Sequence, residues 1–128
     1  MPRFSANIST LFTELPFLER FAAARSAGFD AVEFQFPYEF TPEAISERVK
    51  DNGLAVVLFN LPPGDFAAGE RGIACHPGRE SEFAAGVAEA LRFARILDCR
   101  TINCLAGLLP THVSQADGRT VLKENLSV

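Results

Sequence analysis

Four short apolar runs alternate with segments of helical periodicity along the 128 residues, and this order restricts the fold more than any other feature. The runs have the length of strands, since strands usually take about 4–8 residues. They cover residues 4–9, 31–36, 54–61 and 101–106. Alternating units of this kind predict an α/β protein with a parallel sheet and right-handed crossover helices.

Start and stop signals delimit the first two helices. Pro16 suits the first turn of a helix because its φ angle is fixed and it lacks an N–H group, and Gly28 is a natural end. Residues 41–43 join a hydroxyl cap, a proline and an acid, which is typical of a helix start. Gly53 ends that second helix.

Residues 81–97 have the clearest helical pattern in the chain. Its apolar residues recur on one face while most of its charged residues fall on the other. That apolar face consists of Phe83, Val87, Leu91, Ala94 and Leu97. A last helix is predicted to begin after His112, and we expect the chain to stop inside it.

Two architectures fit this order, an open doubly wound sheet and a TIM barrel. The first strand-to-helix turn, residues 9–14, lacks the glycine fingerprint of a dinucleotide site, which favours the barrel. We therefore interpret residues 1–128 as a single partial TIM-barrel domain, made of the first four strands and truncated in the fourth helix.

Each apolar run also carries a polar residue. In a barrel, inward-pointing residues near the carboxyl ends of the strands converge on the active site. We therefore predict as substrate-binding residues Asn7, Glu33, Asn60 and Asn103. The alternative is that these groups bond to neighbouring loops, or that Glu33 pairs with a Lys or Arg.

The third run is followed by an unusually long loop, residues 62–80. Connections in compact domains usually take about 2–6 residues, and longer loops are mostly functional or disordered. This loop keeps Phe66, Ile73 and Cys75, whereas a disordered linker would be poor in large apolar groups. We therefore predict an ordered loop at the mouth of a site. Its chemically capable side chains are Glu70, Arg71, His76 and Arg79.

Composition excludes several classes of partner. The net charge is −4 and the Lys and Arg residues are scattered, which argues against nucleic acid and anionic membrane surfaces. No apolar run approaches the roughly 18–20 residues that span a bilayer, and the first residues lack a signal-peptide pattern. The three cysteines form no CxxC pair, which is typical of reduced thiols. We expect a cytoplasmic protein.

Four segments carry a family resemblance that extends over essentially the whole chain. They are RFSANISTLFTELPFLERF, AVEFQFPYEF, LFNLPPGDFAAGERGIACHPGRE and INCLAG. They resemble the N-terminal half of the hydroxypyruvate isomerase family, which belongs to the xylose isomerase-like TIM barrels. The loop motif GDFAAGERGIAC is the specific part. Close relatives act on four-carbon 2-oxo acids, so the motif identifies a subfamily better than a substrate.

The resemblance implies an isomerase that interconverts hydroxypyruvate and tartronate semialdehyde. This reaction needs a base that moves a proton between adjacent carbons. It also needs a divalent metal, Mg²⁺ or Mn²⁺, or hydrogen-bond donors to stabilise the enediolate. The resemblance places these groups on later strands, so we expect no catalytic residue and no metal ligand in this chain. The alternatives are an isomerase or epimerase of another small sugar acid, and a non-catalytic half-barrel that binds a ligand.

Within the loop, the resemblance suggests substrate-binding roles for Arg71 and Glu70. Arg71 would clamp the substrate carboxylate with paired N–H groups. Glu70 would accept from a substrate hydroxyl or hold Arg71 in place, and the alternative is a structural Glu70–Arg71 ion pair. We expect His76 to be a solvated loop residue and Arg79 a surface charge at a helix start.

Half a barrel would leave its first and fourth strands as open edges, which invite pairing with another chain. The inner faces of Phe4, Ile8, Val57 and Ile102 would lose their packing partners. We therefore expect a homo-oligomer through the open edges or a marginally stable chain.

Overall fold

The computed structural model describes residues 2–127, which divide into two compact units. The first unit takes the chain up to Phe59 together with Arg92–Ile102, and the second takes Asn60–Leu91 together with the residues from Asn103 onward. Each unit is described by itself. Among residues 2–127, no helix is both long enough and apolar enough to cross a bilayer.

Four strands form one sheet in the order of the sequence: β1 (Ala6–Asn7), β2 (Ala31–Glu33), β3 (Ala55–Asn60) and β4 (Ile102–Asn103). The pairs β1–β2 and β2–β3 are parallel, as the alternating pattern predicts. An irregularity between Val32 and Glu33 shifts the register, so that Glu33 lies opposite Leu58.

Three of the strands are shorter than predicted, because the chain turns or finds another neighbour before the apolar run ends. The chain turns directly after β1, where the backbone N–H groups of Thr10 and Leu11 donate to the carbonyl of Asn7. Beyond β4 the backbone bonds to the long loop instead, with Cys75 N donating to Ala106 O at 2.8 Å. Only β3 keeps nearly its predicted length.

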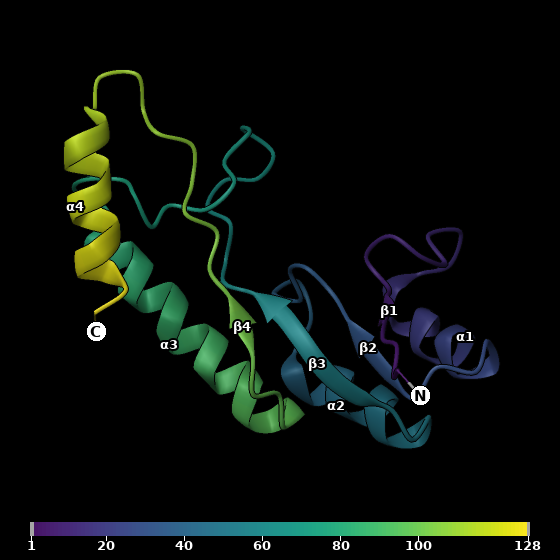
Figure 1. The fold of residues 1–128 in the computed structure, drawn as a ribbon. Helices are drawn as coiled ribbons and strands as arrows, with labels where there is room; N and C mark the ends of the chain where they lie inside the picture. The colour runs from purple at the N-terminus through teal and green to yellow at the C-terminus, as the bar shows by residue number, and fades with distance from the viewer. Residues whose placement is uncertain (1, 128) are drawn as a thin grey trace. The chain divides into compact units, whose positions relative to one another are not determined.

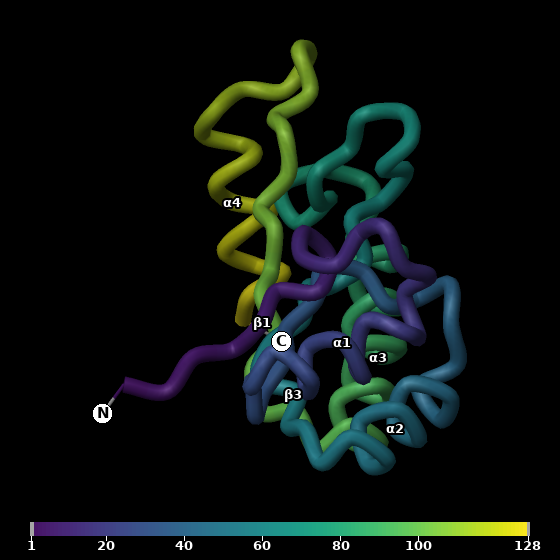
Figure 2. The backbone as a smooth tube through the Cα atoms, turned by 90° about the vertical axis from the view of Figure 1, so that its right-hand side faces the viewer, coloured from purple at the N-terminus to yellow at the C-terminus, as the bar shows by residue number. Residues whose placement is uncertain are grey.

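The first unit is built from β1, β2, most of β3 and the helices that cover one face of these strands (Figure 1; Figure 2). The predicted first helix is a 3₁₀ turn, η1 (Phe17–Glu19), followed by α1 (Arg20–Ser26). The second helix, α2 (Pro42–Asp51), begins as predicted: Thr41 Oγ1 accepts from Ala44 N at 3.2 Å.

Alternate strand residues point toward these helices and form the core of the first unit. Ala6, Ile8, Val32 and Val56 are buried. Five phenylalanine rings add aromatic contacts around this core: Phe17, Phe21, Phe34, Phe40 and Phe59.

The second unit joins the long loop to the start of α3 (Glu80–Leu97) and to α4 (Gln115–Asn125). Its core is Ile73, Ala74 and Phe83, with partly buried apolar residues packed against them. Ser114 caps α4 by accepting from Asp117 N, and Leu126 takes the capping position at its other end. Buried Asn125 donates to Ala74 O at 2.9 Å, which attaches α4 to the loop.

The predicted apolar face of the third helix needs one correction. Leu91 is 43% exposed, whereas Ala90 and Phe93 are buried. Phe83 and Leu97 are buried as predicted. In the middle of α3, the buried face therefore runs through Ala90 and Phe93, each one residue before the predicted positions Leu91 and Ala94.

Candidate functional site

In the first unit, the structure brings two predicted site residues together at the carboxyl ends of β1 and β2. Glu33 accepts two hydrogen bonds, from Ser5 Oγ at 3.0 Å and from Asn7 Nδ2 at 3.3 Å. Asn7 is itself fixed, because its Oδ1 accepts from Ser9 N at 3.1 Å. Within residues 2–127 Glu33 has no Lys or Arg partner, so neutral donors hold its carboxylate.

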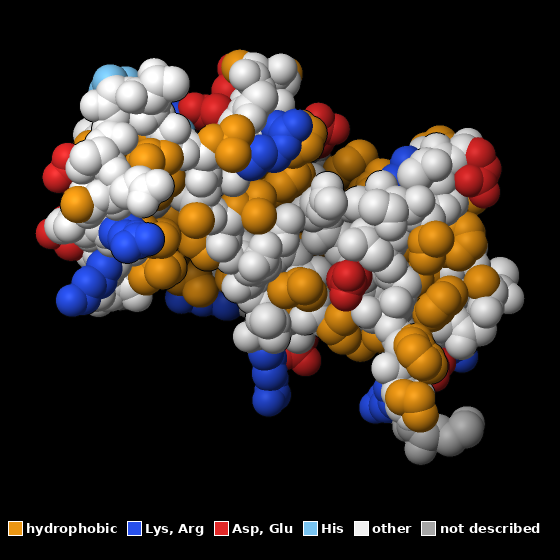
Figure 3. Space-filling model, turned by 45° about the horizontal axis from the view of Figure 1, so that its top comes forward, with side chains coloured by type: hydrophobic (Ala, Val, Ile, Leu, Met, Phe, Trp, Pro, Cys, Tyr) orange, Lys and Arg blue, Asp and Glu red, His pale blue; other side chains and the backbone are white. Residues whose placement is uncertain are grey.

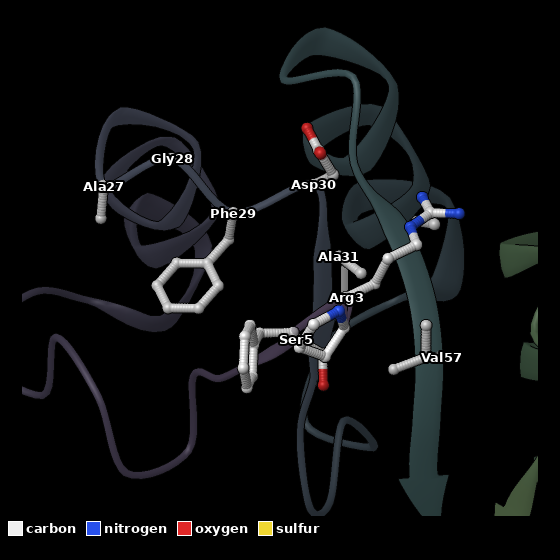
Figure 4. Close-up of a pocket in the computed structure, with 11 residues that line it drawn as sticks. Arg3, Ser5, Ala27, Gly28, Phe29, Asp30, Ala31 and Val57 are labelled. Atoms are coloured by element: carbon white, nitrogen blue, oxygen red, sulfur yellow. The ribbon is translucent and has the colours of Figure 1, made fainter.

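A hollow of about 740 Å³ lies beside the amino-terminal ends of β2 and β3 (Figure 4). Ser5, Ala31, Ala55 and Val57 are among the residues that line it. Active sites of parallel barrels form at the carboxyl ends of the strands, so this hollow lies at the wrong end to be a candidate active site.

The uncovered face of the first unit bears apolar side chains (Figure 3, right-hand side). Val57 is 40% exposed, as we expect of an inner-face residue without a covering layer, and Phe4, which precedes β1, is 71% exposed. The same expectation is wrong for Ile8, which is fully buried. Ile8 follows Asn7, the last residue of β1, and it is buried like Ala6 on the helix-covered face.

In the second unit, the structure brings Asn60 and Asn103 together. Asn103 Nδ2 donates to Asn60 Oδ1 at 3.0 Å, and the backbone of Asn103 accepts from Leu61 N at 2.9 Å. The two amides lie at the carboxyl ends of β3 and β4. The four polar strand residues therefore form two hydrogen-bonded pairs, one in each unit.

The long loop leaves the end of β3 and contains an arginine held between two carboxylates (Figure 1, teal, between β3 and α3). Arg79 donates through Nη1 and Nη2 to Glu70, and through Nε and Nη2 to Glu82 at 2.8 and 2.7 Å. Arg79 lies at the start of α3, as expected, but its side chain is only 30% exposed and bonds to two carboxylates, so it is more than a surface charge. It joins the loop to the first turn of α3.

The Glu70 carboxylate is also held by the backbone of its own loop. Its Oε2 also accepts from the backbone N–H of Asp65, and a Cβ atom added at Gly64 would clash with that oxygen. The hydrogen bond from Arg79, and then that from Asp65, hold the pKa of Glu70 below its ordinary value. Hydrogen bonds to Glu82 and Glu70 raise the pKa of Arg79.

Arg71 does not pair with Glu70, so the alternative of a structural Glu70–Arg71 ion pair is wrong. Arg71 Nη1 instead donates to the carbonyls of Phe66 and Glu70, at 3.1 and 2.7 Å. Its guanidinium carbon lies 3.8 Å from the centre of the Phe66 ring, a cation–π contact.

The spacing of three residues between Arg79 and Glu82 suggests their contact from the sequence alone. The contact between Arg79 and Glu70, nine residues earlier, has no such signal.

Two glycines let the loop cross closely over the segment after β4. A Cβ atom at Gly72 would lie 2.7 Å from the carbonyl carbon of Leu105, and one at Gly107 would lie 3.0 Å from that of Gly72. His76 Nε2 bonds to Leu108 O at 2.7 Å, so His76 is not the purely solvated residue that we expected. These contacts fix the loop on which Arg71 stands.

Within residues 2–127, no three His, Cys, Asp or Glu side chains converge as metal ligands would. We assign no step through a divalent cation to the residues that the structure describes.

Comparisons with known proteins agree with this architecture. A profile of the xylose isomerase-like TIM barrel family matches residues 21–127. Hydroxypyruvate isomerase from Escherichia coli K12 is 52% identical over 126 residues, which is 98% of this chain and 49% of the relative. 2-Oxo-tetronate isomerase from Cupriavidus necator is 47% identical over 99% of this chain and 49% of its own length.

One solved structure, titled an AP endonuclease of family 2 from Brucella melitensis, superposes with a TM-score of 0.94. It is 50% identical and covers 98% of this chain, which in turn covers 48% of it. The chain thus spans about half the length of the curated relatives it matches. The parallel sheet and its helices correspond to half of a barrel, which confirms the predicted fold, and the chain belongs to the xylose isomerase-like TIM barrel family.

Proposed function

We propose that this chain supplies substrate binding to an isomerase that interconverts hydroxypyruvate and tartronate semialdehyde. A relative named hydroxypyruvate isomerase is 52% identical to the chain over 126 aligned residues, which supports this assignment. The observation that carries the proposal is Arg71, a guanidinium held in place by two backbone carbonyls and an aromatic ring. A planar fork of N–H donors matches the carboxylate that both compounds carry.

In the proposed reaction a proton leaves C3 of hydroxypyruvate and a proton is added at C2, through an enediol in which both carbons carry oxygen. The electron pair of the broken C3–H bond forms the carbon–carbon double bond while the C2 oxygen takes up a proton. That pair then forms the new C–H bond at C2, while the C3 hydroxyl gives up its proton and becomes the aldehyde oxygen. No carbon skeleton bond is broken and no oxidant is consumed. Arg71 would bind the carboxylate next to C2 and so fix the orientation of the reacting carbons.

The polar pair of the second unit suits the remaining oxygens of such a substrate. Asn60 and Asn103 lie at the carboxyl ends of β3 and β4 and offer two amides. Amides can donate to an oxo group and accept from a hydroxyl. Glu70 would serve the loop rather than the substrate, because Arg79 and Asp65 already bond to its carboxylate. We assign the proton transfer to no residue of this chain.

The test uses the purified 128-residue chain and hydroxypyruvate, with binding and turnover both followed by NMR. We expect saturable binding that shifts the signals of Arg71, without conversion to tartronate semialdehyde even when Mg²⁺ or Mn²⁺ is added. Absence of binding would contradict the proposed role. Clear turnover would show that the chain does contain the proton-transferring groups.

A second candidate substrate is the four-carbon 2-oxo-tetronate, because a relative named 2-oxo-tetronate isomerase is 47% identical over nearly the whole chain. Both compounds present a carboxylate next to an oxo group, so Arg71 would bind either one. The same titration with 2-oxo-tetronate separates them, since the preferred compound binds at the lower concentration.

A further inference from the structure

The long loop contains two arginines and a glutamate that could pair with either of them. Glu70 is the neighbour of Arg71 in the sequence, yet its carboxylate bonds to Arg79 through two N–H groups. Arg79 donates in the same forked way to Glu82, so it lies between two acids. The set of Glu70, Arg79 and Glu82 therefore carries one net negative charge.

Arg71 is left with an open edge by this arrangement. Its Nη1 is occupied by the carbonyls of Phe66 and Glu70. Within residues 2–127, its Nε and Nη2 have no hydrogen-bond partner and no carboxylate pairs with it. The Phe66 ring against the guanidinium fixes the plane of the group. Nε and Nη2 together present the two parallel N–H groups that a carboxylate accepts side by side.

Glu70 would compete for that edge if Arg79 did not hold it. An ionised carboxylate that loses its partner is attracted to other cations close by, and Arg71 is the adjacent residue in the chain. Gly64 contributes to the present arrangement, because any side chain there would displace the Glu70 carboxylate from its place beside Asp65 N.

We propose that Arg79 is a positioning residue for substrate binding. By holding Glu70, it keeps the Nε–Nη2 edge of Arg71 open for the carboxylate of a small 2-oxo acid. This inference rests on the proposed function, in which Arg71 binds that carboxylate. It assigns to Arg79 a contribution to affinity that requires no contact with the substrate.

The test compares three variants of the 128-residue chain by NMR titration with hydroxypyruvate. Arg79→Gln should raise the Kd by about tenfold or more, because the released Glu70 would neutralise Arg71 in the same network. The double variant Glu70→Gln/Arg79→Gln should bring the Kd back to within about threefold of the wild type, since the competing charge is gone. Arg25→Gln removes an exposed ion pair in the first unit and should leave the Kd unchanged.

The NMR signal of the Arg71 Nε–H group shows directly, without any ligand, whether Glu70 has moved from Arg79 to Arg71. In Arg79→Gln it should shift and exchange more slowly with solvent, because Glu70 accepts from it. In the double variant it should return to the wild-type position.

Three outcomes would overturn the inference. An unchanged Kd in Arg79→Gln would show that Arg79 does not affect Arg71. Equal loss of binding in the single and double variants would show that Arg79 only braces the loop. An Arg71 Nε–H signal that stays the same in all variants would show that Glu70 does not move to Arg71, and this result does not depend on ligand binding. A wild-type chain that binds no hydroxypyruvate would contradict the proposed function alone.

Discussion

Glu70 shows how single residues acquire a defined protonation state in this loop. The hydrogen bonds from Arg79 and Asp65 favour its charged form and lower its pKa. A carboxyl whose pKa is lower in the folded than in the unfolded chain adds stability above the unfolded value, near about 4.3 for a glutamate. That stability is lost as the pH falls through the lower folded pKa.

The loop should therefore loosen in acid. We expect the Asp65 N–H group to become less protected from hydrogen exchange as the pH drops below the ordinary pKa of a glutamate. The intrinsic rate of a model peptide serves as the reference at each pH. In Glu70→Gln this acid step should be absent, because the amide does not titrate. An acid step of equal size in the variant would show that another group loosens the loop.

At the scale of an element, the path of the long loop depends on the close crossing at Gly72. Replacing Gly72 by alanine should destabilise the chain by about 1–3 kcal/mol, the usual cost of forcing atoms into a packed place. Both the crowded Leu105 backbone and the positive φ of 98° contribute to this cost. Urea unfolding measures the free energy.

Gly69 provides the matched control, because its φ is 99° and nothing lies within 4 Å of the added Cβ atom. Gly69→Ala therefore has the backbone strain without the clash, and it should cost less than Gly72→Ala. Equal losses in the two variants would assign the whole effect to the backbone angle and contradict the importance of the crossing.

Elements also show what sequence reasoning can reach. The caps at Thr41 and the periodicity of the helices are local signals, and the structure confirms these helices within a few residues. The strands β1, β2 and β4 are shorter than their apolar runs, because pairing depends on neighbours that are distant in the sequence. The bond between Arg79 and Glu70 depends on the path of the loop, for which no local pattern exists.

At the scale of the whole molecule, the sheet order leaves β1 and β4 at its two ends. Unpaired strand edges and exposed apolar side chains such as Phe4 and Val57 favour association with another chain. We expect the molar mass of the 128-residue chain from light scattering to rise with concentration.

A substitution on the exposed face tests this expectation. Val57→Lys places a charge on the inner face and should lower the apparent mass, because a desolvated charge opposes association. Lys50→Ala alters an exposed charge on α2 and serves as the control. A wild-type chain that stays monomeric at all concentrations and unfolds cooperatively would contradict the expectation.

The paired hydrogen bonds from Arg79 to Glu70 and to Glu82 restrain the position of the long loop. Arg79 directly precedes α3, and Glu82 belongs to the first turn of that helix, so the loop tip with Glu70 is tied to the helix start. Any movement that carried Glu70 away from α3 would have to break its hydrogen bonds with Arg79.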